Sequence, residues 1–178
     1  ARSFRTSPLP AGDVDGDGLP NSWEIAGYDA NNDGVIDVDL PALGANYRHK
    51  DIFVEMDYMI TPGGVDLGPN QAVIDAIVAV FAAAPIANPD GATGINIHLE
   101  KDDPVPYDSY LVIWNEFDAI KNVYFDPKRI ATHHYMIWAN QYAANQSSGV
   151  SRGIPATDFI VTVGSWNSQG GTFEQRLG

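Results

Sequence analysis

Acidic side chains recur at alternate positions near the start of the chain, between residues 13 and 24. This stretch fits the calcium-loop pattern D-x-[DN]-x-[DN]-G-x5-E at every fixed position. Calcium takes roughly six to eight oxygen ligands at about 2.3–2.6 Å, and a loop with this spacing can supply them. The expected ligands are Asp13, Asp15, Asp17, Leu19 through its backbone carbonyl, Asn21 directly or through water, and Glu24. The alternative is an acidic, glycine-rich surface turn that binds no ion.

A second acidic loop follows and repeats the first nine positions of the pattern. Its candidate calcium ligands are Asp29, Asn31, Asp33, Val35 and Asp37. The twelfth position holds Leu40, so Asp37 or Asp39 would have to replace the missing glutamate. The alternative is an Asx-rich turn held by its own side chains. Residues 21–26 predict one short helix that ends at Gly27, so the loops are EF-hand-like but lack long flanking helices.

Charge and composition limit the partners that the chain can have. The 178 residues include 10 Lys and Arg against 23 Asp and Glu, which gives a net charge of −13, and no cysteine. This charge argues against nucleic acid and anionic membranes as partners. It suits a secreted protein that meets calcium outside the cell, where the ion would stabilise a chain without disulfides. Residues 1–4 hold no apolar signal core, so we expect any export leader to be missing from this sequence.

Hydrophobic periodicity predicts an α/β fold with a twisted, mostly parallel sheet, one or two covering helices and an antiparallel edge strand. Strands are expected at residues 50–60, 94–100, 132–142 and 158–163, and helices at 69–84 and 114–125. Residues 101–109 are expected to form a loop, and residues 145–153 a loop or short edge strand. We divide the chain into an extended lead-in over 1–12, a calcium-loop segment over 13–40 packed on the main domain, and an α/β subdomain over 41–178.

Two carboxylates interrupt the most apolar predicted strand. Glu55 and Asp57 are two residues apart, so their side chains point to the same face of the sheet. They could form a metal site or a paired acid and base of a hydrolase. Alternatively, they cap that face, or Asp57 anchors a nearby loop, and this structural interpretation is the one we favour.

Several stretches together resemble one family of secreted bacterial zinc metalloproteases of the metzincin-like kind. They are DGDGLPNSWE at 15–24, LPALGAN at 40–46, HKDIFVEMDYM at 49–59, NPDG at 88–91, SSGVSRGIP at 147–155 and DFIVTVGSW at 158–166. The resemblance spans nearly the whole chain. It implies that the sheet forms the upper half of an active-site cleft for a peptide or protein substrate. It also implies an edge strand that pairs with extended substrate, formed by Ser148, Gly149, Val150, Ser151, Arg152 and Gly153.

The zinc motif of such proteases, H-E-x-x-H, is missing from this sequence. That motif places two histidines one helical turn apart, with a glutamate that activates water. None of His49, His98, His133 and His134 has a partner at that spacing, and we expect structural roles for them. A cross-strand zinc site using His98 with His133 or His134 has no motif behind it.

The chain therefore resembles the N-terminal part, or fragment, of a calcium-stabilised zinc endopeptidase that ends before its catalytic helix. On that reading, zinc is bound only through the missing helix, this chain alone is an inactive hydrolase fragment, and its own C-terminal fragment is a partner. The alternative is a non-catalytic calcium-binding scaffold that binds a protein partner at its edge strand.

Overall fold

The chain folds as an α/β unit built on one five-stranded sheet. The structure is a computed structural model and describes residues 11–142 and 147–163. The strands are β1 (Asp51–Met59), β2 (Asn96–Val105), β3 (His133–Ala139), β4 (Gly149–Ser151) and β5 (Asp158–Thr162). Their order in the sheet is β2-β1-β3-β5-β4. All neighbours pair in parallel except β4 and β5, so the predicted mostly parallel sheet with an antiparallel edge strand is confirmed.

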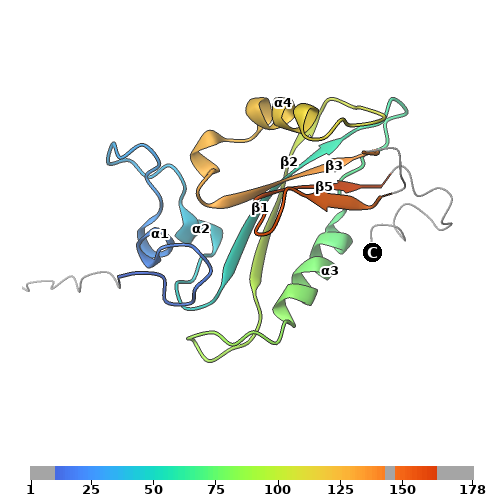
Figure 1. Cartoon of the computed structure of the whole chain (residues 1–178). Helices are drawn as coiled ribbons and strands as arrows, with labels where there is room; N and C mark the ends of the chain where they lie inside the picture. The colour runs from blue at the N-terminus through green and yellow to red at the C-terminus, as the bar shows by residue number, and fades with distance from the viewer. Residues whose placement is uncertain (1–10, 143–146, 164–178) are drawn as a thin grey trace, which may run out of the picture.

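Two helices cover opposite faces of the sheet, as Figure 1 shows. Helix α3 (Gln71–Ala82) connects β1 to β2, and helix α4 (Asn115–Tyr124) connects β2 to β3. Asn70 caps α3 by accepting a hydrogen bond from the backbone N–H of Val73. Phe117 of α4 is fully buried beside the rings of Trp114 and Tyr135. Each helix therefore presents an apolar stripe to the sheet, as the helical spacing predicts.

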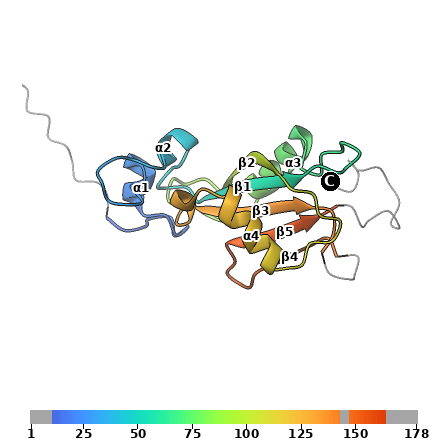
Figure 2. The same cartoon turned by 90° about the horizontal axis from the view of Figure 1, so that it is seen from above.

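A separate acidic segment lies at the end of the sheet where β1 begins (Figure 1 and Figure 2). It contains helix α1 (Asn21–Ala26), which ends at Gly27 as predicted, and helix α2 (Leu40–Leu43). Leu19, Val38 and Leu40 of this segment bury their side chains against Phe53 of β1. This small second core fixes the acidic loops to the first strand of the sheet.

Two parts of the fold differ from the prediction. Residues 101–105 are not loop, because β2 continues to Val105. Pro104 is tolerated there because β2 is an edge strand, where a missing N–H breaks no ladder. The short helix α2 was not predicted, and Asp39 caps it by accepting a hydrogen bond from Ala42 N. A 3-10 turn at Pro127–Arg129 also precedes β3.

The two carboxylates inside β1 have structural partners, so the structural interpretation is the one that their contacts support. Arg129 Nη1 donates to Glu55 Oε2 at 2.9 Å. The Tyr135 hydroxyl donates to Asp57 Oδ2 at 2.5 Å, and Asp103 N donates to Asp57 Oδ1 at 3.1 Å. Asp57 thus fixes the last part of β2. Burial raises the pKa of Glu55 to about 7 against the opposing effect of Arg129.

Parts of the predicted organisation lie outside the described residues. Most of the extended lead-in, residues 1–10, lies outside them, as do residues 143–146 and 164–178. In residues 11–142 and 147–163, no helix combines the length and apolar character that crossing a membrane requires.

Candidate metal centre

The first acidic loop wraps its backbone around its own carboxylates. Asp13 accepts hydrogen bonds from the N–H groups of Gly16 and Gly18, at 2.7 and 3.0 Å. Asp17 Oδ1 accepts from Leu19 N at 2.7 Å, and Asp15 Oδ1 accepts from Asp17 N at 3.3 Å. These local bonds turn the chain through Gly18, whose φ of 99° favours glycine.

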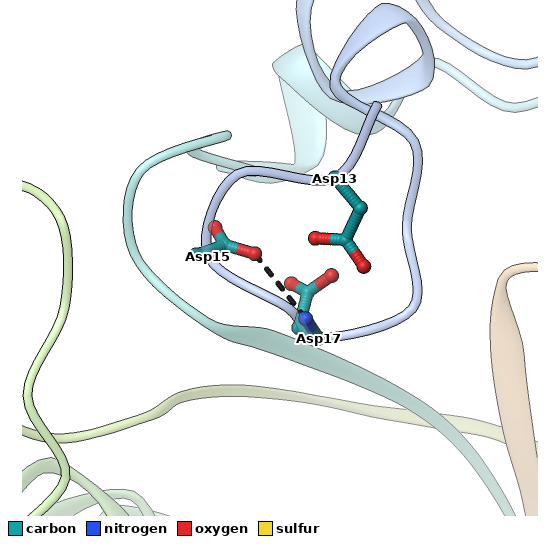
Figure 3. A group of neighbouring side chains, drawn as sticks. All are labelled: Asp13, Asp15 and Asp17. Atoms are coloured by element: carbon teal, nitrogen blue, oxygen red, sulfur yellow. Dashed lines mark hydrogen bonds between the residues drawn. The ribbon is translucent and has the colours of Figure 1, made fainter. Parts of the chain in front are cut away.

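The side chains of Asp13, Asp15 and Asp17 converge on one point inside this turn, as Figure 3 shows. One oxygen from each carboxylate lies within 4.8 Å of one oxygen from each of the others. Asp13 is exposed, whereas Asp15 is buried and its Oδ2 atom has no hydrogen-bond partner among the described residues. Three carboxylates this close repel one another unless a cation lies between them.

Glu24 closes the loop from helix α1 and is the clearest sign of a metal site. Its residue exposure is 3%, and neither carboxylate oxygen has a hydrogen-bond partner among the described residues. A buried carboxylate without partners is costly, because it loses its hydration and gains nothing in return. In the calcium-loop pattern this glutamate is the ligand that supplies both oxygens. The Glu24 carboxylate is therefore buried without hydrogen-bond partners, and a bound metal ion would stabilise it.

Asp51, at the start of β1, joins the same cluster. One of its carboxylate oxygens lies within 4.8 Å of oxygens from Asp17 and Glu24. Its backbone N–H donates to Asp17 Oδ2 at 2.8 Å, and its own carboxylate accepts from Asn46 N and contacts His98 Nε2. Asp51 is 27 residues beyond Glu24, outside the twelve-residue pattern, so the sequence analysis missed it. Its position as an acidic residue at the start of a buried strand was the only available signal.

Crowding in this cluster shifts the protonation of its carboxyls. Burial, reinforced by the charges of Asp17, Asp15 and Asp51, raises the pKa of Glu24 to about 8. Burial and the neighbouring Asp17 raise the pKa of Asp15 to about 6. A divalent cation would reverse these shifts, because it favours the ionised form of every carboxylate that contacts it.

Two of the predicted calcium ligands have other roles in the structure. Asn21 Oδ1 accepts from Val14 N at 2.9 Å, and Asn21 Nδ2 donates to Ala11 O at 3.2 Å. The Asn21 side chain therefore braces the loop, and a water-mediated contact with calcium stays a prediction. The Leu19 side chain lies in the small second core, and calcium binding by its carbonyl likewise stays a prediction.

The second acidic loop copies the backbone turn of the first with fewer free carboxylates. Asp29 accepts from the N–H groups of Asp33 and Gly34, and Asp33 accepts from Val35 N. Asn31 bonds to Asp33 through both its oxygen and its nitrogen. Asp37 pairs with Lys128 Nζ at 2.6 Å and accepts from Ala30 N, while Leu40 is fully buried. These bonds are those of an Asx-rich turn, and calcium in this loop stays a prediction.

Each of the four histidines has a polar partner among the described residues. His49 contacts Asp90, His98 contacts Asp51, His133 contacts Thr132 and His134 contacts the carbonyl of Ala156. The Phe53 ring lies between His98 and His133, with its centroid 4.3 and 5.3 Å from theirs. His133 and His134 occupy adjacent positions in β3 and point to opposite faces. This arrangement supports the structural roles that we expected.

The predicted substrate-binding edge is formed by β4 and its flanks. Ser148 O accepts from Thr162 N, and Arg152 N donates to Asp158 O, so these residues bond inward to β5. Alternation then turns the backbone of Gly149 and Ser151 outward. The Gly149 carbonyl already accepts from the Tyr142 hydroxyl, and the Arg152 guanidinium lies over the Trp114 ring. The Gly149 carbonyl is therefore already engaged, and substrate binding at this edge stays a prediction.

Replacing Glu24 with glutamine should change stability in opposite directions with and without calcium. In EDTA at about pH 9, Glu24 of the parent is ionised and unpaired, so E24Q should unfold at higher urea, with a gain of about 1–3 kcal/mol. In saturating calcium the order should reverse, because the amide is a poorer ligand.

The parent in EDTA should also lose stability as pH rises from about 5 to 8. Burial raises the pKa of Glu24 in the folded chain, so over that window the folded chain binds more protons than the unfolded chain. The free energy of unfolding therefore falls as the pH rises.

The matched control for E24Q is Asp102→Asn, which removes an exposed carboxylate of β2 away from the loop. This variant should follow the parent in both buffers. An E24Q variant that is less stable than the parent in both buffers would show that Glu24 has a partner other than a cation.

Comparisons of the chain with protein-family models, with curated proteins and with solved structures found no match. No relative therefore supplies a function. Among the described residues, the acidic cluster of Asp13, Asp15, Asp17, Glu24 and Asp51 could hold a metal ion.

Proposed function

We propose that the chain is a calcium-binding α/β scaffold, in which an ion bound by the first acidic loop fixes the acidic segment to the sheet. The observation that carries this proposal is the buried Glu24 carboxylate with two unpartnered oxygens. Asp17 is grouped with Glu24 on one side and with Asp13 and Asp15 on the other, so the carboxylates of the turn lie next to Glu24. The ion would neutralise these carboxylates, whose mutual repulsion otherwise lowers the free energy of unfolding.

The ligand chemistry favours calcium over other common ions. Every candidate ligand is a carboxylate or carbonyl oxygen, and hard oxygen ligands suit calcium and magnesium rather than zinc or copper. Magnesium demands near-octahedral geometry and keeps several of its waters, so it suits sites with one or two carboxylates. A turn with three aspartates and a glutamate, which the calcium-loop pattern assigns as the ligand that binds through both oxygens, suits the larger, less demanding calcium ion.

Calcium bound here would act on the whole chain and not only on the loop. The small second core joins the loop to β1 through Leu19 and Phe53, and β1 is the strand between β2 and β3. An ion that binds the folded loop but not the unfolded chain stabilises the fold by mass action, by about 2.7 kcal/mol at a concentration of 100 Kd. This mechanism suits a secreted protein without disulfides, and secretion is part of the proposal.

Calcium should raise the unfolding temperature of the parent, and Asp17→Ala should lose most of that gain. Asp17 contributes to the carboxylate cluster and also accepts the N–H of Asp51, so its loss weakens both ion binding and the junction. Differential scanning calorimetry in EDTA and in millimolar calcium measures the effect. Asp102→Ala is the control and should gain as much as the parent. If Asp17→Ala gains as much as the parent, calcium binds elsewhere.

The second candidate function is that of the N-terminal part of a secreted zinc endopeptidase. What favours it is the edge strand β4, which pairs antiparallel with β5 where the resemblance implies a substrate-binding edge. Zinc would be bound only by a catalytic helix that these residues do not provide. Peptide or protein substrate and a companion C-terminal fragment would then be the partners, and no nucleic acid or membrane is involved.

An intact-mass spectrum of the protein purified from its native source separates the two candidates. A longer chain, or a second polypeptide carrying H-E-x-x-H, together with casein hydrolysis that stops when zinc is chelated, would support the protease. The 19.3 kDa chain alone, with no hydrolysis in the presence of zinc and calcium, would leave the calcium-binding scaffold.

A further inference from the structure

The carboxylates near the start of β1 form two groups and not one. The first group is Asp13, Asp15 and Asp17, and the second is Asp17, Glu24 and Asp51. Within each group, one oxygen from every residue lies within 4.8 Å of the others. The two groups share Asp17, so their centres lie side by side. The first group belongs to the loop, whereas the second joins the loop, helix α1 and β1.

A single calcium ion does not balance the charge of this cluster. The two groups together contain five different carboxylates, which carry −5 when ionised. One divalent ion leaves −5 + 2 = −3, and a second leaves −5 + 4 = −1. The ammonium of Lys50 lies near Gly16 and offers one positive charge at the edge of the loop. Because Glu24 and Asp51 are both almost fully buried, a residual −3 would be poorly screened.

Glu24 is the member of the second group whose oxygens no protein group occupies. Both of its oxygens are buried and without a hydrogen-bond partner among the described residues. Its neighbours in the second group already have one contact at each oxygen. Asp17 accepts from Leu19 N and Asp51 N, and Asp51 accepts from Asn46 N and contacts His98 Nε2 at 2.6 Å. Each carboxylate oxygen has a second lone pair, so these bonds orient Asp17 and Asp51 and leave room for a metal contact.

We propose that the second group is a further calcium site, in which Asp17 and Glu24 bridge two ions and Asp51 binds only the second. This inference rests on the proposed function, because the second ion adds to the loop ion. Its consequence is a direct metal link between the acidic segment and the first residue of β1. The first ion would act on the sheet through the small second core, and the second would link the loop to β1 directly.

The test is to count bound calcium ions by native mass spectrometry and to measure their affinities by isothermal titration calorimetry. Asp33→Ala is introduced into every protein, so that the second acidic loop contributes no ion. We expect two calcium ions per chain in this reference protein and one after adding Asp51→Ala. The matched control, Asp102→Ala in the same background, should retain two.

The other possible results distinguish a failure of the second site from a failure of the proposed function. One ion in the reference protein, or two ions after Asp51→Ala, would overturn the second site and leave the loop site standing. No ion in the reference protein would overturn the proposed function itself. If Asp51→Ala does not fold, Asp51→Asn keeps an acceptor for Asn46 N but loses the charge. That variant should bind one of the two ions about tenfold more weakly than the reference protein does and bind the other with unchanged affinity. If neither affinity differs from that of the reference protein, the proposal is overturned.

Discussion

The junction between the acidic segment and the start of β1 depends on the buried carboxylate of Glu24, which has no hydrogen-bond partner among the described residues. Burying an ionised group without partners costs several kcal/mol, and Asp15, Asp17 and Asp51 add like charges around it. A chain that folds with such a group in place gains from any cation that fits. The same helix, α1, that carries Glu24 also closes the small core on Phe53, so the cation and the core hold the same junction.

Other buried charges of the sheet show what a satisfied carboxylate looks like in this protein. Glu55 has Arg129, and Asp57 has the Tyr135 hydroxyl and a backbone N–H. These pairs make the polar residues of β1 compatible with burial. Glu24 of α1 differs from both, because neither of its oxygens has a hydrogen-bond partner among the described residues, and this contrast supports the proposal that it binds a metal.

Much of the fold was predictable from the sequence, because its strands and helices carry clear periodicity. Residues 51–59 are almost continuously apolar, and Phe117 and Ile120 mark one face of α4, so element type followed from local pattern. Tertiary placement was harder. The extension of β2 through Pro104 depends on its position at an edge, and the role of Asp51 depends on a contact with a residue 27 positions away. The pattern also gave Asn21 a ligand position without revealing that its side chain bonds to Val14 and Ala11.

The most direct measurement is a crystal structure of the protein grown in calcium, repeated with terbium to locate the ions by anomalous scattering. We expect anomalous density at about 2.3–2.6 Å from the oxygens of Asp13, Asp15 and Asp17, with both Glu24 oxygens in contact with metal. Crystals that show no anomalous density at this cluster, with Glu24 bonded to protein or water, would contradict it.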